Sequence, residues 1–350
     1  MNKIQEFNFE LKEDLETEAT EGFCNKWVIN RRDKEGRHYK FWIKIGANDW
    51  SGFYDHQSLG EFMYYQVAKD LGLEKFVLPY HLCIVNLKDS TGKVIPTLGC
   101  YSLSMNRENE ELISLDKLDR ERVYKSNEDG AIEYKDLIVS LSKRTEIPVG
   151  NIRAWLDVCI LLDSICLNTD RRMANLAVIR DKDTGKFRLA PIFDSGQSFL
   201  LKDNLCAVYS WDDYIIQNES IYTKLLIRDS NRFHDYDLPF THFYSTDKGR
   251  EKLKVMSNKN FTNTKNSLDI VFKIFGSSLD SQWDSDMQQK VKAIRKAVYP
   301  AIEINERNFI MDMILGRAET VINQRRPEFV PKSPSDYDKN TYETYYRYFK

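Results

Sequence analysis

The residues best suited to chemistry lie between positions 168 and 196, which read NTDRRMAN, LAVIRDKDTGKFRLA and PIFDSG. Asp170 precedes Asn175 by five positions, and Asp194 follows an apolar run and comes before a small residue and a glycine. Phosphoryl transfer needs a carboxylate, an amide and a second carboxylate in this order along the chain. One carboxylate accepts the proton of the attacking hydroxyl, and an amide oxygen and a second carboxylate hold Mg²⁺ beside the phosphates. The spacing therefore predicts a phosphotransferase site, with Asp170 as the base and Asn175 and Asp194 as metal ligands.

Each part also has an ordinary explanation, because Asp, Asn and Thr favour turns and caps. The helix and strands expected around the motif favour a catalytic site over ordinary turn and cap residues. An apolar helix is expected over Val149–Leu167, directly before the motif, and two short strands follow it, Leu176–Arg180 and Phe187–Pro191. A hairpin of this size can return Asp194 to the side of Asn175. A carboxylate at the end of an apolar strand is costly to bury unless it is paired or binds a metal ion.

The first hundred residues predict a small mixed sheet with one helix. The β-rich runs Lys26–Asn30 and His38–Ile45 flank a polar turn and are expected to form a hairpin. Two further strands are expected over Phe76–Leu87 and Ile95–Met105, and residues 1–20 form either a loose tail or a short edge strand.

A lysine on a strand and a glutamate on a helix are the other parts that phosphoryl transfer needs. Lys44 alternates with apolar neighbours in the second strand, and Glu61 lies in a helix expected over Leu59–Leu71. Both have ordinary explanations: strand lysines are usually solvated, and Glu61 completes an S-x-x-E capping box with Ser58, with Gly72 ending the helix. Before the first strand, Gly22 and Lys26 form either a phosphate-covering turn or a simple strand entry.

Composition excludes several other classes of protein. A net charge of −2 over 350 residues provides no basic field to attract nucleic acid or acidic lipid. The six scattered cysteines form no zinc pattern and indicate reduced thiols, and the longest apolar run, 158–167, is interrupted by Asp163 and too short to span a bilayer. A cytoplasmic location is expected, because the acidic N-terminus does not read as a signal peptide. The part after Asn106 is expected to be mainly helical, and residues 201–265 remain unassigned.

These residues resemble the HipA-like serine/threonine kinase family. The segment LLDSICLNTDRRMAN (161–175) is similar to the family pattern D-x-L-x-x-N-x-D-R-H-x-x-N, and APIFDSG (190–196) is similar to its metal motif. WIKI (42–45) and the helix after it resemble the family's lysine strand more weakly. Arg172 departs from the pattern, since the family usually has His there. The length resembles the short members of the family, which lack an extra N-terminal subdomain.

The resemblance implies a role for each matching position. Asp170 would be the catalytic Asp, Asn175 and Asp194 would bind Mg²⁺, and Lys44, with Glu61 as its partner, would contact the ATP phosphates. Gly22 to Lys26 would cover the nucleotide, and Ser102 to Ser104 would form the hinge that binds adenine. The expected fold is α+β and bilobal, like that of protein kinases: a mixed-sheet N-lobe with one helix over residues 1–105, and a larger, mainly helical C-lobe over residues 106–350.

The expected function is transfer of the γ-phosphate of ATP, with Mg²⁺, to a Ser or Thr hydroxyl of a protein substrate. Two alternatives stay open: a non-catalytic nucleotide-binding pseudokinase, and a kinase of small molecules or lipids. No nucleic-acid or membrane partner is expected, and the sequence does not indicate the oligomeric state.

Overall fold

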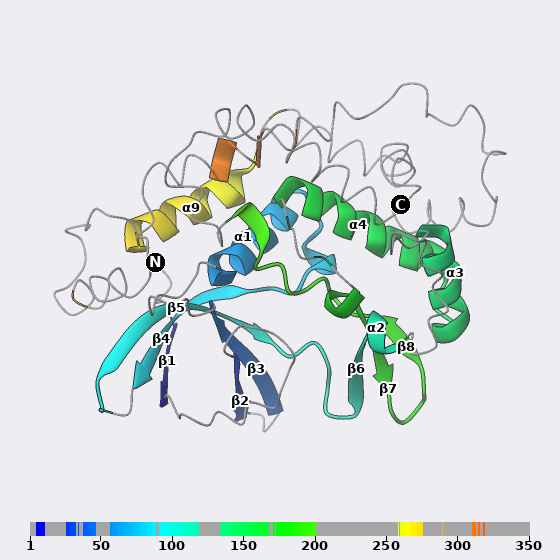
Figure 1. The fold of residues 1–350 in the computed structure, drawn as a ribbon, viewed down its shortest axis with the longest axis horizontal. Helices are drawn as coiled ribbons and strands as arrows, with labels where there is room; N and C mark the ends of the chain where they lie inside the picture. The colour runs from blue at the N-terminus through cyan, green and yellow to red at the C-terminus, as the bar shows by residue number, and fades with distance from the viewer. Residues whose placement is uncertain are drawn as a thin grey trace.

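A computed structural model describes residues 5–10, 26–32, 34, 38–46, 57–88, 91–118, 134–166, 168, 171, 173–200, 258, 260–275, 289, 310–312, 314–315 and 318. The chain forms a mixed α+β fold with two sheets, which lie along the lower edge of Figure 1 with helices above them. Within the described residues, no helix combines the length and the apolar character needed to cross a bilayer.

The larger sheet has five strands in the order β1-β4-β5-β3-β2. They are β1 (Gln5–Glu10), β2 (Lys26–Arg32), β3 (His38–Ile45), β4 (His81–Lys88) and β5 (Val94–Leu103). The expected β2–β3 hairpin is present, and β1 is the edge strand that was one alternative for residues 1–20. It pairs in parallel with β4, which makes the sheet mixed. The strand expected from Phe76 begins later, because Glu74–Phe76 forms a 3-10 turn, η1.

Helix α1 (Gln57–Asp70) contacts this sheet and two other helices, α4 (Val149–Cys166) and α9 (Thr262–Phe275). Its C-terminal end follows the sequence prediction. Gly72 has a left-handed φ of 61°, and Leu73 N–H donates to the Ala68 carbonyl at 2.7 Å. This arrangement is a Schellman motif, in which glycine adopts a conformation that other residues rarely take.

The smaller sheet has the order β6-β7-β8, with strands β6 (Glu110–Ser114), β7 (Ala177–Asp181) and β8 (Phe187–Leu189). The β7–β8 hairpin follows the prediction, whereas β6 was not foreseen. Its EELIS segment has no alternating apolar pattern, and its pairing with β7 produces the strand. The remaining elements are α2 (Leu115–Leu118), α3 (Tyr134–Thr145), η2 (Met173–Asn175) and η3 (Ser198–Leu200).

The two faces of the larger sheet serve different cores. Ile43 and Ile45 point to one face, where they are almost fully buried with Trp27 and other apolar side chains. The opposite face packs on α1 through Ile84 and Leu98 in the main core, which also contains α4. Because side chains alternate along a strand, Lys44 must lie on this second face.

Candidate active site

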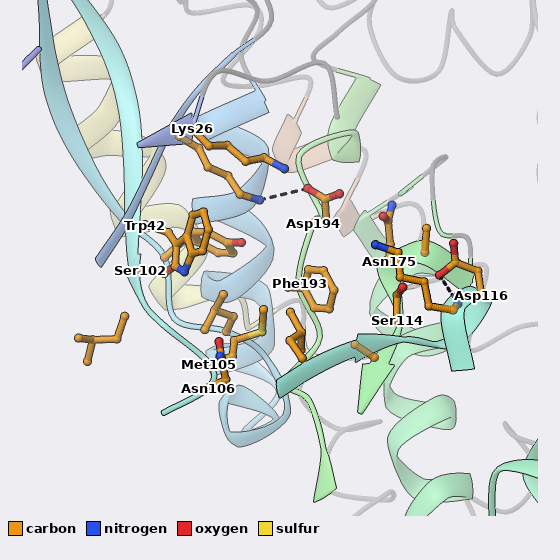
Figure 2. Close-up of a pocket in the computed structure, with 18 residues that line it drawn as sticks. Lys26, Trp42, Ser102, Met105, Asn106, Ser114, Asp116, Asn175, Phe193 and Asp194 are labelled. Atoms are coloured by element: carbon orange, nitrogen blue, oxygen red, sulfur yellow. Dashed lines mark hydrogen bonds and ion pairs between the residues drawn. The ribbon is translucent and has the colours of Figure 1, made fainter. Parts of the chain in front are cut away.

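A cavity of about 390 Å³ lies between the second face of the larger sheet and the elements around the smaller sheet. Its lining includes the apolar side chains of Met105 and Phe193 and, near Asp194, the charged side chain of Lys26 (Figure 2). Apolar and polar side chains line the cavity in similar numbers, and a concave pocket of this size in which polar groups converge is typical of small-molecule sites.

Lys44 joins two carboxylates that are remote in sequence. Its Nζ lies 2.8 Å from Glu61 Oε1 and 3.1 Å from Asp194 Oδ1, so that β3, α1 and the loop after β8 meet at one ammonium group. These three residues are called the cavity cluster below. The Lys44 ammonium also lies 5.2 Å from the centre of the Tyr80 ring. The interactions hold the lysine at the cavity wall rather than in solvent.

Glu61 uses both carboxylate oxygens in tertiary contacts. Oε1 accepts from Lys44, and Oε2 accepts from the backbone N–H of Ser195 at 2.9 Å. The capping-box interpretation is therefore wrong. The helix already begins at Gln57, and the Ser58 hydroxyl donates to the Lys44 carbonyl at 3.3 Å. Glu61 and Ser58 therefore form hydrogen bonds with residues remote in sequence, in place of the local bonds of a capping box.

The charges of the cavity cluster stabilise one another. Burial alone would lower the pKa of Lys44, but the negative charges around it, Glu61 foremost, hold this pKa well above 10.5. The Lys44 ammonium foremost, with smaller contributions from Lys26 and Arg171, lowers the pKa of Asp194 to about 2 against the opposing effect of burial. Both groups are therefore charged at neutral pH.

Asp194 lies in the segment after β8, which pairs with the segment between η1 and β4. Ile192 forms a bridge with Val77, and its N–H donates to the Phe76 carbonyl at 2.7 Å. Asp194 itself has a φ of 57°, which is uncommon for a residue with a side chain. Strained backbone of this kind persists only where surrounding contacts hold it, and such residues cluster at functional sites.

Asn175, on η2, is buried and lines the same cavity as Asp194 (Figure 2). The Asp194 side chain is 34% exposed, and among the described residues only Lys44 bonds its carboxylate. One carboxylate with a second oxygen open to the cavity, together with one amide, is a donor set that suits Mg²⁺ when phosphate oxygens complete the shell. The described residues contain no cluster of three His, Cys, Asp or Glu side chains that could hold a metal ion alone.

Lys26 is the cross-strand partner of Lys44 in the β2–β3 register, so both side chains emerge on the same face. Lys26 lines the cavity, and Figure 2 shows its ammonium directed toward Asp194. The cavity therefore receives two ammonium groups from adjacent strands, which suits an anionic ligand.

The two hinge serines differ in position. Ser102 is buried and lines the cavity, whereas Ser104 is not among the lining residues. The Ser104 N–H donates to the Lys40 carbonyl at 2.7 Å, and its hydroxyl donates to Asn106 Oδ1 at 3.1 Å. In this conformation the Ser104 amide is used within the sheet, so its assignment to adenine remains a sequence prediction.

Asp170, Gly22 and Arg172 lie outside the described residues. The roles inferred for the first two therefore rest on the sequence alone, and so does the effect of Arg172 in the position where the resembled family has His.

Arg171 and Asp163 form a buried ion pair that sequence reasoning missed. Arg171 Nε lies 2.9 Å from Asp163 Oδ2, and Arg171 Nη2 lies 3.1 Å from Asp163 Oδ1. Asp163 Oδ1 also accepts from the Tyr64 hydroxyl and from Asn168 Nδ2, each at 2.9 Å. Tyr64, Asp163, Asn168 and Arg171 are called the buried network below.

The remaining donors of Arg171 hold the two expected metal ligands in place. Nη1 donates to the carbonyls of Asn175 at 3.2 Å and Phe193 at 2.6 Å, and Nη2 donates to Ser195 Oγ at 3.0 Å. All five guanidinium N–H groups are thereby used. Arg171 thus fixes the backbone of Asn175 and both neighbours of Asp194. The one available signal in the sequence was Asp163, an acidic residue inside an apolar helix.

No protein-family profile matches the chain, and no curated protein is significantly similar to it in sequence. Among solved structures, the chain is similar to the Helicobacter pylori proinflammatory kinase CtkA, with 12% identity and a TM-score of 0.42 over 86% of this chain and 98% of CtkA. It is also similar to HipA of the Shewanella oneidensis MR-1 toxin–antitoxin system, solved with HipB and operator DNA. That match has 13% identity and a TM-score of 0.39, over 88% of this chain and 66% of HipA. Both TM-scores are below 0.5, so the function has to be inferred from the residues of this chain.

Proposed function

We propose that this protein is an ATP- and Mg²⁺-dependent phosphotransferase with a bilobal, kinase-like arrangement, and that a protein Ser or Thr hydroxyl is its acceptor. The observation that carries the proposal is the position of Lys44, which is shared between Glu61 and Asp194 at the wall of the cavity. A strand lysine that pairs with a helix glutamate, beside a metal-binding aspartate, is the arrangement that positions ATP phosphates in protein kinases.

The cavity provides distinct surroundings for the parts of a nucleotide. The apolar side chains of Leu78, Met105 and Phe193 suit a planar base, and the ammonium groups of Lys26 and Lys44 suit the phosphates. Asn175 and Asp194 would hold Mg²⁺, which would neutralise phosphate charge when bound.

In the proposed reaction, the acceptor hydroxyl oxygen forms a bond to the γ-phosphorus as the bond from that phosphorus to the β-γ bridging oxygen breaks. The hydroxyl proton passes to Asp170, and ADP leaves. Asp170 has this role from its spacing to Asn175 in the sequence. The chain's main contribution is to position the reactants and to place fixed charges around them.

The decisive experiment incubates the purified chain with MgCl₂, radiolabelled ATP and a general protein substrate, followed by a mass-spectrometric search for phosphosites. Asp194→Asn is the test variant, and Lys186→Met, which changes an exposed lysine in the β7–β8 turn, is the matched control. We expect transfer by the wild type and by the control, and a loss on the order of 10²-fold or more in Asp194→Asn.

Each alternative has its own result in this experiment. ATP binding without transfer, measured by calorimetry with the wild type, would identify a non-catalytic nucleotide-binding module. Transfer to a lipid or small-molecule panel but not to protein would keep the phosphotransferase and change the acceptor. Absence of both binding and transfer would overturn the proposal.

A further inference from the structure

Two glycines bring α1 into backbone contact with the loop that carries Asp194. A Cβ atom built on Gly60 would lie 2.5 Å from the carbonyl oxygen of Gly196 and 3.2 Å from its Cα. In the other direction, a Cβ atom on Gly196 would lie 3.1 Å from both Cβ and O of Gln57. At Gly60 no side chain fits unless the backbone moves.

Neither glycine is explained by its own conformation. The glycines with left-handed φ in the described residues are Gly72, Gly92 and Gly185, so a left-handed backbone does not explain Gly60 or Gly196. Gly60 also lies inside a helix, where glycine is the poorest residue after proline. The close approach of the two backbones is therefore the reason that remains for a glycine at position 60.

The contact lies beside the atoms that make up the cavity cluster. Glu61 follows Gly60 directly, and its Oε2 accepts from the N–H of Ser195, which precedes Gly196. The other oxygen of Glu61 accepts from Lys44 at 2.8 Å. A shift of the first turn of α1 away from the loop would therefore lengthen the hydrogen bond to Ser195 and change the position of Glu61 relative to Lys44.

We propose that Gly60 and Gly196 are a positioning pair, whose backbone contact sets the distance between α1 and the Asp194 loop and so keeps Lys44 shared between Glu61 and Asp194. The consequence for phosphoryl transfer rests on the proposed function, whereas the positioning itself does not. Glu61 Oε1 holds the Lys44 ammonium at 2.8 Å, so displacement of α1 should weaken this hydrogen bond and leave Lys44 more accessible from the cavity.

The test is Gly60→Ala, with the rate of Lys44 acetylation by an amine-specific reagent measured by peptide mass spectrometry without nucleotide. The control is Lys69→Ala, which places an alanine on the exposed side of the same helix. We expect Lys44 to react at least about threefold faster in Gly60→Ala at a fixed pH, because a lysine that has lost one of its two hydrogen-bond partners is held less firmly and is more accessible to the reagent. Lys69→Ala should react like the wild type.

Gly196→Ala is the second variant and decides the matter if Gly60→Ala does not fold. Its contacts of 3.1 Å are less severe than 2.5 Å, so a smaller increase in the same direction is expected. Unchanged Lys44 reactivity in the folded glycine variants, or an equal increase in Lys69→Ala, would overturn the proposal. If the glycine variants expose Lys44 while the wild type transfers no phosphate, the positioning pair stands and the proposed function fails.

Discussion

Helix α1 contributes residues to two groups of charged and polar side chains, which differ in how exposed their charged groups are. Glu61 belongs to the cavity cluster, and Tyr64, three residues further along, belongs to the buried network. Residues at this spacing share one face of a helix. The Asp194 carboxylate of the cavity cluster is about one-third exposed, whereas Asp163 and Arg171 are both at most 8% exposed.

This difference separates a site that can receive a ligand from one that holds the backbone. Arg171 uses every donor, and both oxygens of Asp163 accept side-chain hydrogen bonds, so the buried network has no capacity for a ligand. Asp194 is charged, strained and open to the cavity. We therefore expect substitutions in the buried network to reduce mainly the stability of the fold, and substitutions in the cavity cluster to reduce mainly the activity.

The largest expected effect on stability comes from Asp163→Asn. This change leaves the Arg171 guanidinium buried without its counter-charge, and breaking a buried pair in this way costs about 3–5 kcal/mol. Urea unfolding measures the loss. Glu111→Gln removes an exposed ion pair with Arg180 and is the matched control, with an expected loss of at most about 1 kcal/mol. Equal losses in the two variants would contradict the distinction between the two groupings.

Glu61→Gln should lower activity more than stability. The substitution removes the charge that orients Lys44 but keeps the shape of the side chain, and Asp194 still pairs with the lysine. We expect kcat for phosphoryl transfer to fall by about 10²-fold, the scale typical of losing one preorganised group. Steady-state kinetics and urea unfolding should be run on the same sample. A loss of stability as large as that of Asp163→Asn would place Glu61 in the structural group instead.

Lys26→Met should weaken nucleotide binding without abolishing transfer. Lys26 lines the cavity beside Lys44 but lies outside the cavity cluster. We expect the KM for ATP to rise by about 5- to 20-fold, corresponding to roughly 1–2 kcal/mol, the scale of a partly exposed charge-assisted contact. Lys186→Met should leave KM unchanged. A drop in kcat at unchanged KM would instead give Lys26 a role in the transition state.

The smallest expected effect is the pH dependence of the stability that the Asp194 carboxylate contributes. It is measured by comparing the wild type with Asp194→Asn. The pKa of Asp194 is lowered from 3.8 to about 2, so the folded state favours the ionised carboxylate. Its stabilising contribution is fully present above about pH 4 and is lost as pH falls through 2. The stability difference between wild type and Asp194→Asn should therefore be constant from pH 7 to 4 and shrink below that, as measured by urea unfolding. A difference that persists unchanged at pH 2 would show that charge is not its cause.

Local patterns predicted the local structure well. The β2–β3 and β7–β8 hairpins, α4 and the glycine end of α1 all follow from periodicity and turn residues. One local prediction was wrong and one strand was not foreseen, for the same reason. Glu61 bonds to Lys44 and Ser195 instead of completing the capping box, and β6 forms because it pairs with β7. In both cases a partner remote in sequence outweighed a local preference.

The sequence by itself determined which residue types could perform phosphoryl transfer and the order in which they occur. Side-chain chemistry and short-range spacing follow directly from the amino-acid sequence. Only the tertiary structure decided that Lys44 and Asp194, 150 positions apart, share a hydrogen bond, and that Arg171 joins α4 to the loops of Asn175 and Asp194. Charged pairs of this kind have no periodicity. Their geometry follows from how the sheet and α1 pack, where the backbones of Gly60 and Gly196 approach closely and Tyr64 of α1 bonds the buried carboxylate of Asp163.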